Sequence, residues 1–512
     1  MNVCTLMRQA VHFNADRPAI ATQDRTLTFS EAWDRGVRLA NGLRALGVQP
    51  GDRVGGVDDN TLGAADLFIA CAIAGAVRVP LYPRNSREAH AYMLGHTQCR
   101  VVVVETSYVP DVAGLEEELA DLAHVLVRDE GYETWLSEQD PTDPKLPIDD
   151  RDWYAIRHSG GTTGKPKGVA YTHQDWLLCC RNWFEGLPRL SQACAIGHAG
   201  PISHASGYFF LPGWLFGGVN VLFGAFDPDT ALDMIERHRV THMVAVPSIL
   251  QALTRAQNAK PRGVDSIEAL LVGGAPITDA TLLAGRETFG RKLYSIFGQT
   301  EALPVALMGP DEWFGEMPGS TPMRSVGRVR PYVELEIRDD AGNALPIGED
   351  GEIVVRVEGQ MHGYWGNEEL TQDTIVDGWV HMGDIGRLDA NGYLYVLDRL
   401  DDKIISGAYN IWPAELETVI ADHPAVIEVA VFGIPDERWG ETPMALCCVD
   451  GTTPVSEEEI IDLCRMRLGS YKRPSRVELT SEPLPKSVVG KLQRKKLREP
   501  YWQDHSSRVA GV

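Results

Sequence analysis

Apolar runs of strand length alternate with amphipathic stretches of helical spacing through the first 300 residues of the chain. The strand-like runs lie at residues 53–57, 101–105, 219–223, 243–246 and 269–272. The amphipathic stretches between them include residues 29–46, 230–239 and 278–289. This alternation is typical of βαβ units, in which helices cover the faces of a parallel sheet. The pattern therefore predicts an α/β fold with parallel βαβ sheets for most of the chain.

The pattern changes after residue 333, where short strands separated by turns take over. Strand-like runs lie at residues 333–337, 351–355 and 393–396, and they predict a β-barrel-like subdomain of antiparallel strands. A final α+β unit begins near residue 400, with helices predicted at residues 414–421 and 457–468. A chain of 512 residues is too long for one compact core. We predict a large N-terminal domain over residues 1–400 and a small C-terminal domain over residues 401–512.

The charge of the chain argues against nucleic acids as general partners. The formal net charge is −23, and an acidic surface repels a phosphate backbone. Basic side chains nevertheless gather toward the C-terminus, at Lys472, Arg473, Arg476, Lys491, Arg494, Lys495 and Lys496. A local basic patch on an acidic protein suits a small anionic ligand better than a polymer.

Composition and segment lengths predict a soluble, cytoplasmic enzyme. The nine cysteines show no Cys-x-x-Cys spacing, which indicates free thiols in a reducing compartment. The apolar run at residues 64–77 is too short to cross a membrane. The run at 206–226 is interrupted by Pro212 and five glycines, and we interpret it as buried strand and pocket wall. We expect no stable membrane span; the oligomeric state stays open, with a homodimer as one expectation.

A glycine-rich run at residues 158–169 carries the first chemical signal. It reads His-Ser-Gly-Gly-Thr-Thr-Gly-Lys-Pro-Lys-Gly-Val and contains four glycines, three hydroxyls and two lysines. Glycines let backbone N–H groups approach an anion closely, and the hydroxyls and ammonium groups add donors, so a polyphosphate is the natural ligand. The run is no Walker loop, because Pro166 stands where a Ser or Thr should follow the lysine. The alternative is a surface linker, which rarely carries Lys-Pro-Lys-Gly at one end.

This run closely resembles the phosphate-binding signature of the adenylate-forming enzymes. These are acyl- and aryl-CoA synthetases, adenylation domains of nonribosomal peptide synthetases and beetle luciferases. The usual form is Ser-Gly-Thr-Thr-Gly-x-Pro-Lys-Gly, and this chain has an extra-glycine variant. Further signatures follow in the family's order, and the resemblance covers essentially the whole chain. It implies the family's plan of a large N-terminal body and a small mobile lid.

The resemblance implies an ATP site built from several segments. In Phe297-Gly-Gln-Thr-Glu301, similar to the family's Tyr-Gly-x-Thr-Glu, Phe297 would pack on adenine, Thr300 contact the α-phosphate and Glu301 help to hold Mg²⁺. Asp384, in a segment similar to Trp-x-x-Thr-Gly-Asp, and Arg399 would contact the ribose. The full set of ATP/AMP contacts that we expect is Ser159, Gly160, Gly161, Thr162, Thr163, Gly164, Lys167, Gly273, Gly274, Ala275, Pro276, Phe297, Gly298, Gln299, Thr300, Asp384 and Arg399.

The C-terminal segment resembles the family's mobile lid. Asp401 occupies the hinge position, about which the lid turns between adenylation and thioester formation. Lys491 follows Pro485 and Gly490 as in the family's terminal signature, so it would bridge the attacking carboxylate and the phosphate oxygens. The residues that we expect to contact CoA are Ser406, Gly407, Ala408, Tyr409, Trp439, Tyr471 and Arg473. Where the family has Gly-Gly this chain has Gly407-Ala408, and the added methyl would narrow the pantetheine tunnel.

The acyl pocket is predicted around the segment that follows residue 200. His204 matches the family's aromatic or histidine gate beside the carboxylate, and a buried structural histidine is the alternative interpretation. Ser206, Gly207 and Phe209 would complete an apolar wall. No Asp stands where amino-acid-activating domains hold a substrate ammonium, which favours an apolar monocarboxylate.

The resemblance therefore implies an AMP-forming carboxylic acid–CoA ligase, with Mg²⁺ as cofactor and ATP and CoA as co-substrates. Lys491, Glu301, Thr300 and His204 would form its catalytic set. The acid would be aromatic, alicyclic or medium-chain. Two alternatives remain open: an enzyme that loads the adenylate onto an acyl carrier protein, and a non-catalytic nucleotide-binding module.

Overall fold

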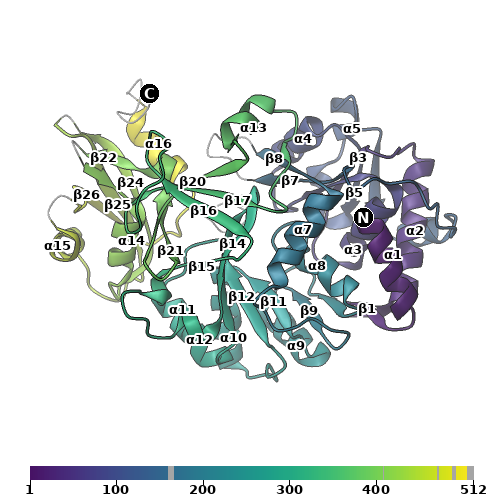
Figure 1. The fold of residues 1–512 in the computed structure, drawn as a ribbon, viewed down its shortest axis with the longest axis horizontal. Helices are drawn as coiled ribbons and strands as arrows, with labels where there is room; N and C mark the ends of the chain where they lie inside the picture. The colour runs from purple at the N-terminus through teal and green to yellow at the C-terminus, as the bar shows by residue number, and fades with distance from the viewer. Residues whose placement is uncertain (160–165, 407–408, 437, 470–471, 487–491, 504–512) are drawn as a thin grey trace. The chain divides into compact units, whose positions relative to one another are not determined.

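The computed structural model describes residues 1–159, 166–406, 409–436, 438–469, 472–486 and 492–503 (Figure 1). The chain divides into two compact units. Unit 1 comprises residues 1–335 and 355–382, and unit 2 comprises residues 336–354 and 383–512.

The first sheet of unit 1 has seven strands in the order β18-β8-β7-β4-β3-β5-β6. The strands are β3 (Arg53–Val57), β4 (Val77–Leu81), β5 (Cys99–Glu105), β6 (His124–Arg128), β7 (Trp153–Ser159), β8 (Lys167–Thr172) and β18 (Gly363–Tyr364). Strands β6, β5, β3, β4 and β7 are parallel neighbours in that order. Strand β8 runs antiparallel to β7, and β18 runs antiparallel to β8. The parallel arrangement places the residues that follow β3, β4 and β5 at one edge of the sheet.

The second sheet of unit 1 runs in the order β15-β14-β13-β12-β11-β9-β10-β1-β2. Its strands are β1 (Pro18–Ala21), β2 (Thr26–Thr28), β9 (Ala195–His198), β10 (Val219–Leu222), β11 (His242–Ala245), β12 (Ala269–Gly273), β13 (Leu293–Gln299), β14 (Ala302–Met308) and β15 (Gly327–Val329). The central strands are parallel, and β14 turns back antiparallel to β13. The turn between β13 and β14 carries Thr300 and Glu301.

Helices cover these sheets, and one large apolar cluster joins five of the helices to strands of both sheets, while α4 packs in a second cluster. The helices of unit 1 that pack on the sheets or on one another are α1 (Val3–Asn14), α2 (Phe29–Ala45), α3 (Leu62–Ala74), α4 (Arg87–His96), α7 (His173–Phe184), α8 (Gly207–Leu215), α9 (Pro228–His238), α10 (Pro247–Ala259) and α11 (Asp279–Phe289). Figure 1 shows α1, α2 and α3 grouped near the N-terminus. Helix α2 begins with a capping box in which Thr28 and Glu31 satisfy each other's backbone donors.

The strands and helices predicted from periodicity are confirmed, with one correction. The run at residues 206–226 was expected to be buried strand, but the structure forms helix α8 first and strand β10 only from Val219. The helix is apolar on every side and almost entirely buried. A helix of this kind has no polar face to reveal its 3.6-residue period, so its sequence cannot be told from that of a buried strand.

Unit 2 contains strand β21, parts of three further strands of the antiparallel region and a small α+β body. Strands β16 (Val333–Arg338), β17 (Gly351–Val357), β20 (Trp379–Leu388) and β21 (Tyr393–Arg399) adjoin in that order. A five-stranded sheet follows, with β22 (Ile404–Ser406), β23 (Tyr409–Ile411), β24 (Val426–Asp436), β25 (Gly440–Val449) and β26 (Arg476–Thr480). Helices α14 (Pro413–Ala421), α15 (Glu457–Leu468) and α16 (Arg494–Trp502) accompany this sheet.

The boundaries of the two units can be compared with the domains predicted at residues 1–400 and 401–512. Unit 2 takes in residues 336–354 and 383–400 together with the segment beyond residue 401 that we predicted as a separate domain. The proposed role of Asp401 as the pivot of the C-terminal lid concerns movement of that lid, and it stays a prediction. Among the helices that the structure describes, none combines the length and apolar character needed to cross a membrane.

Candidate active site

A β-hairpin holds the two ends of the glycine-rich run. Strands β7 and β8 are antiparallel, and Ser159 at the end of β7 lies opposite Lys167 at the start of β8. The predicted phosphate contacts Gly160, Gly161, Thr162, Thr163 and Gly164 lie outside the described residues. Burial lowers the pKa of His158, the first residue of the run, to about 3, and the neighbouring His96 lowers it further. The imidazole of His158 is therefore neutral at pH 7, and it adds no positive charge for a phosphate.

Glu301 joins the glycine-rich run to the second signature. Its side chain is buried, with 8% of the residue exposed. Carboxylate atom Oε1 accepts a hydrogen bond from Ser159 Oγ at 3.1 Å and another from the Tyr364 hydroxyl at 3.0 Å. The Nζ atom of Lys167 lies 5.3 Å from the centroid of the Tyr364 ring. Residues separated by 142 positions, Ser159 and Glu301, are thus brought into direct contact.

The backbone around Thr300 and Glu301 is held on both sides. The Tyr171 hydroxyl donates to the carbonyl of Thr300, and the Met361 N–H donates to the carbonyl of Glu301 at 2.8 Å. Carbonyls fixed in this way hold the β13–β14 turn in one conformation. The Glu301 carboxylate and the Thr300 hydroxyl are therefore presented on a rigid support, which favours a site that must position a charged ligand.

The loop at residues 273–276 lies beside the strand that carries Phe297. Gly273 pairs with Ile296 across the parallel strands β12 and β13. A Cβ atom on Gly273 would stand 2.2 Å from the Ile296 carbonyl oxygen, and Gly274 has a φ of 80°, so both positions require glycine. Phe297, Gly298, Gln299 and Thr300 are half-buried. Ala275 and Pro276 follow directly, so the predicted adenine-side residues are adjacent in space.

Gln299 has a structural partner within unit 1. Its Nε2 atom donates to the carbonyl oxygen of Met382 at 2.7 Å. Met382 replaces the Thr or Ser of the family's third signature, and its own side chain is buried. The hydrogen bond uses the backbone of residue 382, so the substitution leaves this contact unchanged.

The two predicted ribose contacts face each other in unit 2. Asp384 on β20 lies opposite Arg399 on β21, and the Arg399 Nε atom is 3.1 Å from the Asp384 Oδ1 atom. The Asp384 side chain is buried, whereas that of Arg399 is partly exposed. A carboxylate held by a guanidinium in this way is fixed in orientation and can accept hydrogen bonds from ribose hydroxyls.

A network of charged side chains surrounds Asp402, the residue after the predicted hinge. Sequence patterns did not predict this network. Arg494 donates through Nε to Glu417 Oε1 at 2.8 Å, and its Nη1 atom lies 3.0 Å from Asp402 Oδ2. The same nitrogen stands 3.9 Å from Asp398 Oδ1. The Asp398 carboxylate also accepts backbone hydrogen bonds from Arg399 at 2.8 Å and Ala414 at 2.7 Å. The chain on both sides of Asp401 is therefore fastened to α14 and α16.

Asp398 predicts a pH dependence of stability. Burial raises its pKa from 3.8 to about 7, against the opposing effect of Arg494. Between these values the folded protein holds a proton that the unfolded chain has released, so stability falls as pH rises through the window. Asp398→Asn cannot titrate, and we expect its melting temperature relative to wild type to increase by about 2 °C or more from pH 4 to pH 8. Asp340→Asn, an exposed position in the same unit, is the control; a pH-independent difference for Asp398→Asn would contradict the assignment.

The predicted CoA contacts that the structure describes come from adjacent strands of unit 2. Ser406 on β22 lies opposite Tyr409 on β23 and also pairs with Gly440, the residue after Trp439. Trp439 is 44% exposed, and the Arg438 guanidinium lies 4.6 Å from its ring centroid. An exposed indole beside a cation suits stacking on a nucleotide base. Arg473 is exposed, while Gly407, Ala408, Tyr471 and Lys491 lie outside the described residues.

The predicted acyl-pocket residues form the loop before α8 and its first turn. His204 Nδ1 lies 3.1 Å from Ser203 Oγ, and its ring meets the edge of Tyr82. Ser206 is buried, with its hydroxyl 2.7 Å from His198 Nδ1. A Cβ atom on Gly207 would stand 2.2 Å from the Ile202 carbonyl oxygen, so this position cannot carry a side chain. Phe209 is fully buried against Trp183 and Phe184.

The structure also adds two residues to the site, Tyr171 and Tyr364. Their hydroxyls bind Thr300 and Glu301 from strands β8 and β18. Neither tyrosine lies in a signature segment, and only the pairing of β8 with β18 brings the two strands together. No signal in the local sequence distinguishes them from other core tyrosines.

Comparisons with known proteins agree with this arrangement. The model of the AMP-binding enzyme family matches residues 6–365, and that of the AMP-binding enzyme C-terminal domain matches residues 415–491. The chain is similar to a feruloyl-CoA synthase of Amycolatopsis sp., with 35% identity over 477 residues that cover 93% of this chain and 94% of that protein. The fatty acid–acyl-carrier-protein ligase ScoC of Streptomyces coeruleorubidus is 30% identical over 506 residues, covering 96% and 95%.

A solved structure extends the similarity to the fold. The anthranilate CoA ligase AuaEII, in complex with anthranoyl-AMP, matches with a TM-score of 0.87 and 27% identity, covering 98% of this chain and 97% of that one. The Glu301 carboxylate, with the Ser159 and Tyr364 hydroxyls that donate to it, lies within the segment that the AMP-binding enzyme model matches. The chain belongs to the AMP-binding enzyme family, which confirms the resemblance and the α/β fold. It is an acid–thiol ligase, and ATP and CoA are the co-substrates that the family implies.

Proposed function

We propose that this protein is an AMP-forming ligase that joins an apolar monocarboxylic acid to CoA. The acid is aromatic, alicyclic or medium-chain, and the similarity to a feruloyl-CoA synthase favours the aromatic class. The observation that carries the proposal is the contact of Glu301 with Ser159 and Tyr364. Through it the phosphate-binding run and the Thr-Glu signature meet at one place, which a structural turn would not require.

The residues around Glu301 fit a magnesium ion. Mg²⁺ in nucleotide sites is held by one or two carboxylates together with substrate phosphates. Glu301 offers a buried carboxylate whose Oε1 atom is positioned by two hydroxyls. The part of the chain that the structure describes contains no cluster of three metal-binding side chains, which suits an ion that arrives with the nucleotide. When bound, the ion would neutralise charge on the phosphates.

The proposed reaction has two steps. A carboxylate oxygen of the acid attacks the α-phosphorus of ATP, and pyrophosphate leaves. The CoA sulfur then attacks the acyl carbon, and AMP leaves as the thiol proton is released. In this scheme Thr300 and Lys491 contact the phosphates, Asp384 and Arg399 hold the ribose, and Phe297 packs on adenine. His204, Ser206, Gly207 and Phe209 are the proposed acyl-pocket residues.

A carrier-protein ligase is the second candidate. The similarity to ScoC, which is named for an acyl-carrier-protein acceptor, is a specific reason to keep it. Both candidates share the adenylation step and differ only in the thiol that receives the acyl group. The exposed Trp439 with its neighbouring Arg438 favours CoA, because a stacked nucleotide is part of CoA and absent from a carrier protein.

The test measures the two half-reactions separately. Acid-dependent ATP–pyrophosphate exchange over a panel of aryl, alicyclic and C4–C12 acids should identify the acid. AMP release should then rise with free CoA, and release only with an acyl carrier protein would establish the alternative. Asp401→Pro, which stiffens the proposed pivot, should slow thioester formation more than adenylation. Absence of exchange with every acid would refute the proposed function.

A further inference from the structure

Two arginines that have no role in the proposed reaction lie buried in the core of unit 1. Arg78 is on β4 and Arg157 is on β7, with 3% and 4% of each residue exposed. The two strands are parallel neighbours, and Arg78 pairs with Ala155. Because strand side chains alternate between faces, Arg157 lies on the same face as Ala155 and Arg78. The positively charged side chains of Arg78 and Arg157 therefore lie in the same apolar layer of the core.

Aromatic rings make up most of the surroundings of these guanidinium groups. Arg78 lies 4.3 Å from the ring centroid of Phe68 and 5.8 Å from that of Trp176. Arg157 lies 4.4 Å from the Tyr208 ring and 5.8 Å from the same Trp176. The ring faces attract both cations, which explains how the side chains are oriented.

Hydrogen bonding leaves both groups short of acceptors. Arg157 donates through Nε to the Ser203 carbonyl at 3.3 Å, but its buried Nη1 atom has no partner. The Nε and Nη2 atoms of Arg78 are buried and unpartnered. Within the described residues Arg78 has no ion pair either. Unpartnered donors are rare in protein interiors, so the buried nitrogens of both arginines call for an acceptor.

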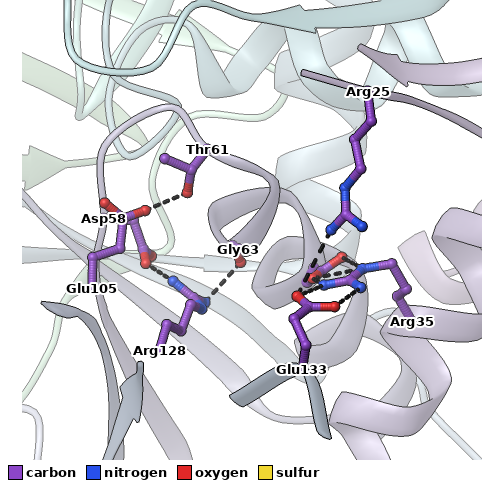
Figure 2. Close-up of polar contacts among 9 residues, drawn as sticks. Arg25, Arg35, Asp58, Thr61, Gly63, Glu105, Arg128 and Glu133 are labelled. Atoms are coloured by element: carbon purple, nitrogen blue, oxygen red, sulfur yellow. Dashed lines mark hydrogen bonds and ion pairs between the residues drawn. The ribbon is translucent and has the colours of Figure 1, made fainter. Parts of the chain in front are cut away.

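Three acidic side chains of this part of unit 1 have other partners, and two of them, Asp58 and Glu105, are labelled in Figure 2. Asp58, which follows β3, forms an ion pair with Arg128. Asp66 on α3 is bound by Arg35 with an Nη2–Oδ2 distance of 2.7 Å. Glu105 accepts a hydrogen bond from the Thr61 hydroxyl. None of these carboxylates neutralises Arg78 or Arg157.

Other acidic groups close by are neutral at pH 7. Burial raises the pKa of the Cys71 thiol to about 12 and raises the pKa of the Tyr154 hydroxyl well above its ordinary value. Burial likewise lowers the pKa of Arg78, and the like charge of Arg157 lowers it further. An arginine nevertheless keeps its proton in proteins. Among the described residues, no acidic side chain therefore forms an ion pair with Arg78 or Arg157.

A small cavity touches Arg78. Its volume is about 20 Å³, and its wall includes Arg78, Asp58, Ser203, Ile202, Gly56 and Pro80. A cavity of this size holds one particle of about the size of a water molecule. The Asp58 carboxylate on its wall is already paired with Arg128, so its charge is largely compensated there. The cavity is too small for the carboxylate of an acyl substrate with its attached chain.

We propose that this cavity is an anion site that binds a single monovalent inorganic anion of the halide class, such as chloride. The anion would accept hydrogen bonds from Arg78 and neutralise the Arg78–Arg157 pair. Ring contacts offset only part of the cost of burying a cation, and a water molecule would supply an acceptor without charge. Ser203 lies on the cavity wall and directly precedes His204 in the chain. An anion in the cavity would therefore help to fix the position of Ser203. This inference is independent of the proposed reaction.

The first test is thermal unfolding of the full chain at constant ionic strength, with sodium gluconate replaced stepwise by sodium chloride. We expect the melting temperature of the wild type to rise by about 2 °C or more. Arg78→Met, which keeps much of the side chain's volume without charge, should lose this chloride response. Arg44→Met, which removes an exposed arginine on α2, should retain it. Equal responses in wild type and Arg78→Met would overturn the proposal, because a general salt effect would then explain them.

The second test needs no variant that has to fold. Crystals of the wild type grown in bromide should show an anomalous scattering peak in the cavity, within hydrogen-bonding distance of the Arg78 guanidinium. A cavity that contains only water in bromide, with no anomalous peak, would overturn the proposal even if Arg78→Met failed to fold.

Discussion

Lys491→Ala is expected to lower acid-dependent ATP–pyrophosphate exchange by about 100- to 1,000-fold while thioester formation from supplied acyl-adenylate continues. The reason is the proposed place of the ammonium between the attacking carboxylate and the phosphate oxygens, where negative charge is transferred. Removing one such donor from a preorganised site costs about 100- to 1,000-fold in rate. The second half-reaction begins with the acyl–phosphate bond already made, so it does not need this group.

The matched control is Lys496→Ala. Lys496 is an exposed lysine on α16, five residues further along the chain, and its loss changes the net charge by the same amount. Exchange in this variant should stay within about twofold of wild type, because an exposed charge contributes little. If Lys491→Ala slowed both half-reactions equally, its role would be general to the lid. If Lys496→Ala matched its effect, the basic character of the segment, rather than one ammonium, would be responsible.

The parallel α/β architecture could be predicted because its strands and amphipathic helices have clear periods. The strand at Arg53–Val57 and the helix at Glu457–Leu468 have the bounds that the sequence predicted. Helix α8 could not be predicted, since an apolar stretch that is buried on all sides has no period to read. A hydrophobic period arises where one face of an element contacts the core and the other contacts water. Almost all of α8 is buried, so its sequence shows no such period.

The candidate site was only partly predictable for a related reason. Signature segments identify Glu301, Asp384 and Arg399, but not the side chains that hold them. Tyr364 reaches Glu301 from 63 residues away, and Arg494 reaches Asp402 from 92 residues away. Such pairs depend on how strands and helices assemble, and no local pattern encodes them.

Buried charge is the property that a single sequence conceals most. Arg78 stands in Val77–Leu81 between valines, and the residue alone would be expected at the surface. Only the structure shows that β4 is central in its sheet and that both faces are covered. The same applies to Asp398, whose raised pKa results from burial beneath α14 and not from its neighbours in sequence.

Glu301→Gln is expected to lower adenylation by about 100-fold or more and to raise the Mg²⁺ concentration that half-maximal exchange requires. Glutamine keeps the size of the side chain and one acceptor oxygen, so the hydrogen bonds from Ser159 and Tyr364 can persist. What is lost is the negative charge, and a hard cation depends on that charge more than on shape. The melting temperature should therefore change little while exchange falls, as measured by pyrophosphate exchange over a Mg²⁺ titration.

Tyr364→Phe separates charge from position at the same site. It removes the hydroxyl that donates to Glu301 at 3.0 Å but leaves the carboxylate in place. Loss of one hydrogen bond to a group that keeps its charge should reduce exchange by about 10-fold or less, with the Mg²⁺ requirement nearly unchanged. Wild-type exchange in Glu301→Gln would remove Glu301 from the metal site. Equal losses in the two variants would mean that the position of the Glu301 carboxylate, set by the Tyr364 hydroxyl, matters as much as its charge, and would contradict the larger effect expected for Glu301→Gln.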